Sequence, residues 1–149
     1  MTDRRAFVVG AAAVAVSAAC PSLAVAQTGP NDIRAVLKTL IGEVTPIEGK
    51  ISLDLPEIAE NGNTVPYIVR IDSPMSDSQY VKAVHLLTPA NPIPQIATFH
   101  FTPVSGKASV ASRMRLAQTQ EVMAVAEISD GTAFMVKRPV RVTVGGCGG

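Results

Sequence analysis

Along most of the chain, hydrophobic and polar residues alternate with a period of two, the pattern typical of a half-buried β-strand. The first clear run is 51–55, and Asp130-Gly131 separates the last two runs as a two-residue hairpin turn. Seven runs separated by turn-forming residues predict an all-β, immunoglobulin-like β-sandwich. The predicted strands are 51–55, 64–71, 80–87, 95–102, 109–118, 121–129 and 132–144.

Two of these runs carry finer predictions. In 109–118, the alternation turns Arg113 and Arg115 towards solvent, while Val110, Met114 and Leu116 face inward. Pro139 lies inside the last run and has no backbone N–H to donate. It therefore predicts an edge position or a bulge in that strand.

Before the strands the period changes and predicts one short helix that Gly42 ends. Asn31 is the expected N-cap, and Asp32 falls in the first turn, where a negative side chain favours the helix dipole. The apolar stripe of this helix predicts that it packs on the strands. The stripe consists of Ile33, Val36, Leu37, Leu40 and Ile41.

Residues 1–26 have the features of an export signal rather than of the folded domain. Arg4-Arg5 is followed by an apolar stretch at 6–19, which is shorter than the roughly 20 residues that span a bilayer as a helix. Ala24-Val25-Ala26 offers the small residues that a signal peptidase accepts. We expect a twin-arginine-type signal, a periplasmic mature chain from Gln27, and no membrane attachment after cleavage.

Length and charge limit the number of domains and the kinds of partner that the chain can have. The chain has 149 residues, enough for one domain with its own core, and a formal net charge of +1. It has no run of Lys or Arg that could follow a phosphate backbone, and only 4% of its residues are aromatic, so nucleic acid is excluded as a partner. The expected organisation is a signal at 1–26, a β-sandwich domain at 27–144 and a mobile arm at 145–149.

Within the predicted domain, few residues could carry out chemistry. His85 and His100 each lie in a predicted strand outside any motif, and the carboxylates are scattered. No nucleophile is paired with a base, and no cluster of ligands suggests a metal site. We therefore expect no enzyme activity and no resident metal. A metal-binding sandwich remains an alternative, with ligands from His85, His100, Met114, Met123 and Met135.

The C-terminal sequence is different, because Cys147 is flanked by Gly145-Gly146 and Gly148-Gly149. Glycine loses the most conformational entropy on ordering, so this segment is predicted to be a mobile arm. The chain has two cysteines, and the other one, Cys20, leaves with the signal. Lipidation of Cys20 is the alternative to its removal.

A single cysteine in an exported chain is either a free thiol or half of an intermolecular disulfide. The last eight residues contain no Lys, Arg or His that would favour the thiolate of Cys147. A weak nucleophile on a glycine arm is typical of a carrier on which other proteins act. The alternative is a periplasmic binding or chaperone-like domain with Cys147 as a disulfide anchor.

The exported domain, the seven strands and the terminal Gly-Gly-Cys-Gly-Gly together resemble the SoxY family, the sulfur-carrying subunits of bacterial thiosulfate oxidation. The segment 55–62 is also similar to that family. The resemblance implies that Cys147 is the covalent attachment point for sulfur and that Gly145, Gly146, Gly148 and Gly149 form its arm. It implies no cofactor other than the sulfur bound to Cys147.

The resemblance also implies a set of partners. A SoxZ-like subunit would form a heterodimer with the chain. A haem-containing enzyme would join thiosulfate to the arm cysteine, and a manganese hydrolase would release sulfate. A sulfane dehydrogenase, in organisms that have one, would oxidise the remaining sulfur.

Overall fold

The computed structural model describes residues 32–146, which form an all-β domain with one short helix. The expected fold class is therefore confirmed, and each of the seven predicted strands has a counterpart. Two further strands, β1 and β3, are short and were not predicted. In chain order the elements are α1 (Ile33–Ile41), β1 (Ile47–Glu48), β2 (Ile51–Asp54), β3 (Ile58–Asn61), β4 (Val65–Ile71), β5 (Val81–Leu87), β6 (Gln95–His100), the 3-10 turn η1 (Pro103–Ser105), β7 (Ala108–Met114), β8 (Gln120–Ile128) and β9 (Ala133–Val144).

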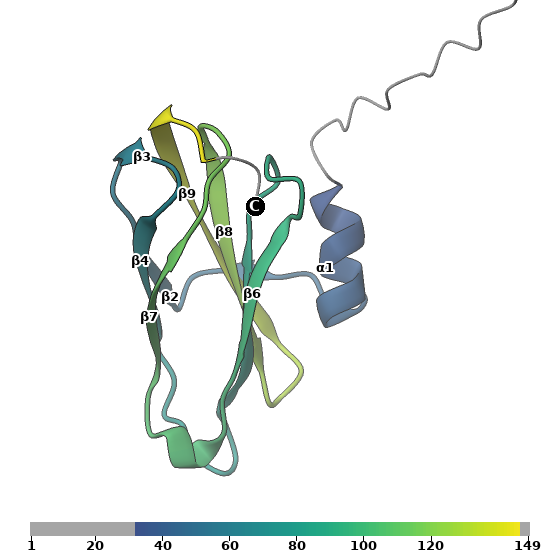
Figure 1. The fold of residues 1–149 in the computed structure, drawn as a ribbon. Helices are drawn as coiled ribbons and strands as arrows, with labels where there is room; N and C mark the ends of the chain where they lie inside the picture. The colour runs from purple at the N-terminus through teal and green to yellow at the C-terminus, as the bar shows by residue number, and fades with distance from the viewer. Residues whose placement is uncertain (1–31, 147–149) are drawn as a thin grey trace, which may run out of the picture.

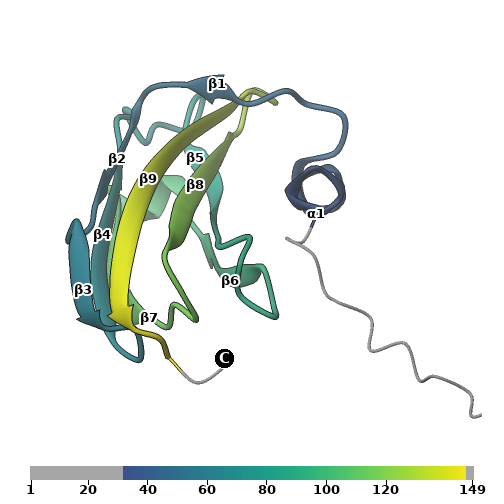
Figure 2. The same cartoon turned by 90° about the horizontal axis from the view of Figure 1, so that it is seen from above.

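The strands form two sheets that face each other (Figure 1). The larger sheet has the order β9-β8-β5-β6, with β1 and β3 along the outer edge of β9, and the smaller sheet has the order β2-β4-β7. Strands β1 and β3 run parallel to β9, whereas the other paired strands are antiparallel. Seen from above, α1 lies outside the sandwich, on the side of the larger sheet (Figure 2).

The outer side of β9 is only partly covered, and Pro139 lies in the uncovered part. Strand β1 pairs with β9 at Phe134 and Met135, and β3 pairs with it from Arg141 onward. The N–H of Arg141 donates outward to the carbonyl of Glu57 at 2.9 Å. Residue 139 shares that orientation, because alternate residues of a strand point the same way. Its missing N–H therefore removes nothing from the ladder with β8. β9 is not an edge strand of the sheet, because β1 and β3 flank it, but the stretch around Pro139 is open on that side.

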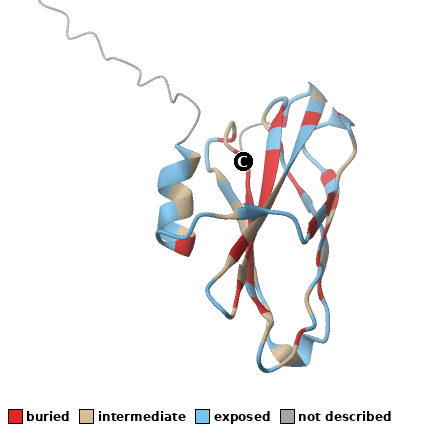
Figure 3. Cartoon of the chain, turned by 180° about the vertical axis from the view of Figure 1, so that it is seen from behind, coloured by how far each residue is buried: buried red, intermediate tan, exposed pale blue. Residues whose placement is uncertain are grey.

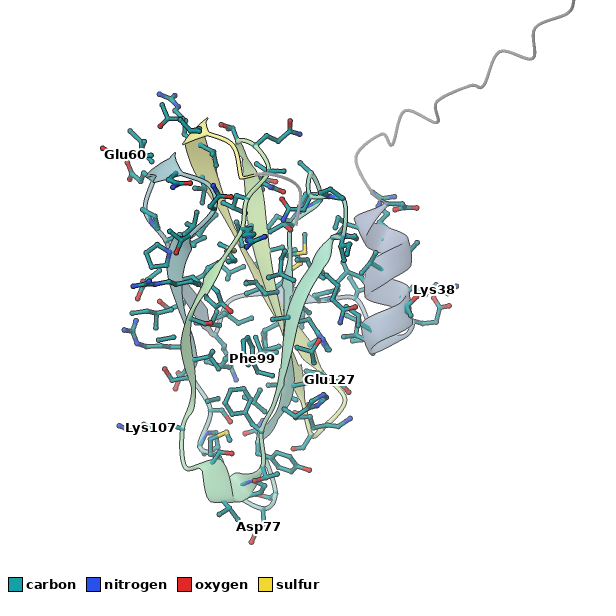
Figure 4. All side chains as sticks on the ribbon, viewed as in Figure 1. Lys38, Glu60, Asp77, Phe99, Lys107 and Glu127 are labelled. Carbon is teal, nitrogen blue, oxygen red and sulfur yellow. The ribbon has the colours of Figure 1, made fainter. Side chains whose placement is uncertain are left out.

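Aliphatic side chains from both sheets fill the space between them. Phe99 projects from β6 into this interior (Figure 4) and packs against the main core cluster. Buried residues follow the strands, whereas the turns at the ends of the sandwich are mostly exposed (Figure 3). Residues with no exposed surface include Val65, Val81, Val84, Leu86, Leu116, Val122 and Val140.

Helix α1 begins one residue later than expected. Its N-cap is Asp32 rather than Asn31, and the Asp32 carboxylate accepts a hydrogen bond from the N–H of Arg34 at 3.0 Å. Asn and Asp cap helices equally well, so the local sequence does not decide which of the two does so. At the other end Gly42 has φ 71° and donates its N–H to the carbonyl of Lys38 at 3.0 Å, as expected of a glycine C-cap.

The apolar stripe of α1 packs on the outer face of the larger sheet, as predicted. Ile41 is the buried end of this stripe, and it forms a second core cluster with residues of β5, β8 and β9. The residues from the sheet are Leu87, Met123, Val125 and Ala133. Within residues 32–146, no helix has the length and apolar character needed to cross a membrane.

Candidate functional site

The segment that leads to Cys147 leaves the end of β9 and is held by two other loops. Gly62 donates its N–H to the carbonyl of Val144 at 2.8 Å. Leu116 donates its N–H to the carbonyl of Gly62 at 2.8 Å, and Gly146 donates its N–H to the carbonyl of Leu116 at 2.9 Å. Three segments that are distant in sequence are thereby joined backbone to backbone. We call this junction of Gly62, Leu116 and Gly146 the arm clamp.

Gly62 is the tightest position of the arm clamp. A Cβ atom on Gly62 would lie 2.3 Å from the carbonyl oxygen of Leu116 and 2.7 Å from the nitrogen of Gly146. Both neighbours are backbone atoms, so neither can turn aside as a flexible side chain would. Only glycine fits here without moving the β3–β4 turn away from the end of β9.

The first two glycines of the expected arm belong to this packed region. Gly146 is buried, and a Cβ atom on it would lie 3.0 Å from the carbonyl oxygen of Gly62. A Cβ atom on Gly145 would lie 2.3 Å from the carbonyl oxygen of Ala117. Glycine content predicts a mobile arm from residue 145 onward, and the hydrogen bond from Gly146 to Leu116 holds the start of that arm against the domain. In both residues the lack of a side chain permits close packing.

Cys147, Gly148 and Gly149 lie outside the described residues. Covalent geometry nevertheless limits where Cys147 begins, because consecutive Cα atoms are about 3.8 Å apart. The attachment point of the thiol is therefore one residue from the arm clamp.

A buried polar network supports the Leu116 side of the arm clamp. Asn91, which is 3% exposed, donates to the carbonyl of Arg115 at 2.8 Å and accepts from the N–H of Ala117 at 2.9 Å. The side chain of Gln120 donates to Asn91 at 2.8 Å and accepts from the N–H of Ala90 at 2.9 Å. These bonds hold the β7–β8 connection on both sides of Leu116.

Sequence reasoning missed these supporting residues. Asn61-Gly62 is a dipeptide typical of a turn, but nothing local shows that this turn meets residues 116 and 146. Asn91 and Gln120 have no motif around them. The one available signal was that Asn91 and Gln120 are polar residues next to apolar strand sequences, which could have suggested a buried hydrogen-bond network.

The histidines and methionines of the alternative metal site do not all gather in one place, although His85 and His100 lie on neighbouring strands, near enough to interact electrostatically. His85 and Met135 lie in one row across the larger sheet, but Val125 on β8 separates them. Met114 is in the core between the sheets, whereas Met123 belongs to the cluster under α1. Among the described residues, no three His, Cys, Asp or Glu side chains are placed to hold a metal ion.

His85 has a structural environment. It is 4% exposed, its Nδ1 is 2.9 Å from the hydroxyl of Thr98, and its Nε2 is buried without a hydrogen-bond partner. Burial lowers the pKa of His85, and the smaller effects of Glu127 and His100 oppose each other. The neutral imidazole is therefore the form that suits this site.

Comparison with known proteins identifies the family. Residues 37–147 match the family described as "Sulfur oxidation protein SoxY", and the matched range includes Cys147. The structure of the sulfur carrier protein SoxY from Chlorobium limicola f thiosulfatophilum is similar, with 31% sequence identity and a TM-score of 0.65. That alignment covers 75% of this chain and 96% of the Chlorobium chain. No curated protein sequence matches.

Two superoxide reductases share the fold alone. One, a neelaredoxin from Ignicoccus hospitalis, has a TM-score of 0.56 and 12% identity over 63% of this chain and 80% of its own. A putative superoxide reductase from Thermotoga maritima has a TM-score of 0.55 and 11% identity over 66% of this chain and 93% of its own. The family match and the Chlorobium structure agree with the glycine-flanked cysteine, and the chain is a member of the SoxY family of sulfur oxidation proteins.

Proposed function

We propose that the chain is a carrier of sulfur intermediates, which it holds covalently on the thiol of Cys147. The observation that supports this proposal most strongly is the family match over 37–147, because it includes the cysteine itself. The similar Chlorobium protein is described as a sulfur carrier. The arm clamp agrees with this role, because it attaches Cys147 one residue from a fixed point of the domain.

The proposed loading step joins the Cys147 thiol to thiosulfate. A sulfur–sulfur bond forms, the thiol proton is released, and two electrons pass to a haem-containing partner enzyme. The product is a cysteine S-thiosulfonate. Water, with a manganese hydrolase, then cleaves the sulfonate group as sulfate and leaves a persulfide on Cys147.

The persulfide has two possible fates in the proposed cycle. A sulfane dehydrogenase oxidises its outer sulfur with three water molecules, which releases six electrons and six protons and gives an S-sulfonate. A second hydrolysis then releases sulfate and restores the thiol. Without that dehydrogenase, the sulfur must leave by another route. In either case the chain is a substrate of its partners and performs no catalysis itself.

The proposed setting is the periplasm, in a heterodimer with a SoxZ-like subunit. The twin arginines at Arg4-Arg5 and the cleavage pattern at 24–26 support export. The partly uncovered edge of β9 supports a partner subunit, because exposed strand edges are commonly covered by another chain.

The direct test replaces Cys147 with Ser and measures thiosulfate-dependent electron release with the purified partner enzymes. We expect turnover to be lost while the unfolding temperature stays unchanged, because the thiol is the attachment point. Intact mass of the unsubstituted protein should show thiosulfonate, sulfonate or persulfide adducts that the variant lacks. Turnover near the unsubstituted level would refute the carrier role. A single disulfide-linked partner without sulfur adducts would support the disulfide anchor instead.

A further inference from the structure

The turn Asn61-Gly62, which belongs to the arm clamp, is a candidate site of spontaneous deamidation. The backbone nitrogen that follows an asparagine can attack the side-chain amide carbon, and glycine hinders this attack least because it has no side chain. No other asparagine in the chain is followed by glycine. Asn91, for comparison, is followed by Pro92, whose nitrogen has no proton to lose. Asn61 is exposed, so water reaches the site.

The side-chain carbonyl of Asn61 is already polarised for this attack. Its Oδ1 accepts a hydrogen bond from the N–H of Asn63 at 2.9 Å. Negative charge develops on this oxygen as the side-chain carbon is attacked, and an N–H that already points at the oxygen stabilises that charge. The electrophilic half of the reaction is therefore in place in the folded protein.

The nucleophilic half, which is the backbone nitrogen of Gly62, is withheld. Its N–H donates to the carbonyl of Val144 at 2.8 Å, and Gly62 itself is buried. The nitrogen attacks only after it loses its proton, and base does not reach a proton that is bonded to a buried carbonyl until the structure opens locally. The carbonyl of Gly62 is bound as well, by the N–H of Leu116. Both sides of Gly62 are therefore fixed until the arm clamp opens.

We propose that Asn61 is a modification site that opening of the arm clamp controls. When the clamp opens, the Gly62 nitrogen loses its proton and forms a bond to Cγ of Asn61. The bond from Cγ to Nδ2 breaks, and ammonia leaves with the proton. Water then opens the succinimide at one of its two carbonyls and gives aspartate or isoaspartate at position 61, without any transfer of electrons. This inference does not depend on the proposed carrier function.

Isoaspartate at position 61 prevents the arm clamp from closing again. It adds one methylene to the main chain directly before Gly62, where even a Cβ atom would lie 2.3 Å from the carbonyl oxygen of Leu116. The longer chain therefore cannot restore the bonds of Gly62 to Val144 and Leu116 together, and Gly146 loses its fixed neighbour. The modification loosens the segment to which Cys147 is attached, and it does not reverse by itself.

The test compares two reactions of the same N–H group, hydrogen exchange and deamidation. The full chain is incubated in warm, mildly alkaline buffer. Peptide mapping measures aspartate and isoaspartate at position 61, and NMR measures exchange of the Gly62 amide. A synthetic peptide of residues 57–67, which lacks Val144 and Leu116, gives the unprotected rate of each reaction. We expect deamidation to be at least about tenfold slower in the folded protein than in the peptide, because it requires local opening.

Gly146→Ala should open the arm clamp without changing the two residues that react. A Cβ at this position lies 3.0 Å from the carbonyl oxygen of Gly62, so one of the two backbones must shift. We expect exchange at Gly62 and deamidation at Asn61 to accelerate by one common factor of at least about threefold, because both depend on the same opening. If this variant does not fold, the comparison of the unsubstituted protein with the peptide still decides.

The matched control is Gly106→Ala. Gly106 has φ 71°, so alanine is strained there as well, but the space around it is open. Lys107, which follows Gly106, and Glu60, which precedes Asn61, lie towards opposite ends of the sandwich (Figure 4). Both rates should therefore match those of the unsubstituted protein. Equal acceleration in the two variants would assign the effect to global stability and overturn the role of the arm clamp.

Three further results would overturn the inference. If Asn61 deamidates as fast in the folded protein as in the peptide, the arm clamp does not withhold the Gly62 nitrogen. If Gly146→Ala accelerates exchange but not deamidation, opening of the clamp is not the controlling step. If the isoaspartate form keeps the slow exchange of the Gly146 amide, the modification does not loosen the clamp. None of these measurements involves sulfur chemistry, so the carrier function and this inference can fail separately.

Discussion

At the scale of single residues, the glycines of the arm clamp and His85 have roles that their residue types alone do not reveal. Gly62 and Gly146 are required where backbones meet, since a Cβ on either would contact backbone atoms at 3.0 Å or less. A valine at residue 146 would therefore disturb the arm clamp before it affected entry of the arm into a partner enzyme. Substitutions that test arm thickness belong at Gly148 instead.

His85 should make the stability of the domain depend on pH. Burial lowers the pKa of His85 below its ordinary value of 6.5. Above that value both the folded and the unfolded chain hold a neutral imidazole, and His85 adds no pH dependence. As pH falls below about 6.5, the unfolded chain binds a proton that the folded chain refuses, so stability falls by at most about 1.4 kcal/mol per pH unit. The loss ends below the folded pKa.

Urea midpoints measured between pH values of about 7.5 and about 5.5, on either side of the ordinary histidine pKa, test this expectation. The decline on acidification should be shallower in His85→Gln, whatever that variant costs at neutral pH. The unsubstituted protein, measured in the same buffers, is the reference. Equal slopes in the two proteins would show that the protonation of His85 does not change on unfolding.

At the scale of elements, the β7–β8 connection acts as a platform for the arm clamp. Strand β7 ends at Met114, earlier than the alternation to residue 118 predicted, because Asn91 takes over the hydrogen bonds around Leu116. This connection keeps Leu116 fully buried and its carbonyl directed at Gly146. The stability of the platform should therefore depend strongly on the Asn91 amide.

We expect Asn91→Ala to lower the free energy of unfolding by about 2–4 kcal/mol. It removes the partner of the Ala117 N–H and of the Arg115 carbonyl in a partly buried place, and it takes one hydrogen bond from the side chain of Gln120. Hydrogen exchange at the amide of Gly146 should accelerate beyond this global effect. Gln118→Ala is the control, because its side chain is exposed in the same connection, and it should change stability by less than about 0.5 kcal/mol. Similar losses in the two variants would contradict the platform.

At the scale of the whole molecule, the open stretch of β9 and the proposed export signal both concern the proposed partner subunit. Strands β1 and β3 cover the two ends of the β9 edge and leave its middle, around Pro139, without a strand partner among the described residues. A partner bound before export would need a route that accepts folded cargo, as the twin-arginine route does.

Replacing Arg4-Arg5 with Lys-Lys should therefore retain both this chain and the proposed SoxZ-like partner in the cytoplasm. Cell fractionation with antibodies to both subunits measures the effect, and an exported protein with an ordinary signal is the control. We expect the periplasmic fraction of each subunit to fall at least about tenfold, because both depend on the one signal. Full delivery of the partner despite loss of this chain would disprove shared export.

The sequence by itself determined most of the secondary structure. The period-two alternation located seven strands, because strands with one face in the core leave that trace in the order of residues. Pro139 indicated a place in β9 that is open on one side, since proline removes one specific hydrogen-bond donor. The apolar stripe of α1 likewise predicted a helix with one face packed against the strands. The glycine-flanked Cys147 identified the candidate attachment site.

Only the tertiary structure decided which distant segments meet. The pairing of β1 and β3 with β9, the choice of Asp32 as the cap and the Asn91–Gln120 network leave no periodic trace, because each depends on loops that the packed sheets bring together. The same reason explains the position of Gly146. Composition describes how freely an isolated glycine can move, but Gly146 donates its N–H to Leu116 and lies against the backbone of Gly62, and both residues come from distant parts of the sequence.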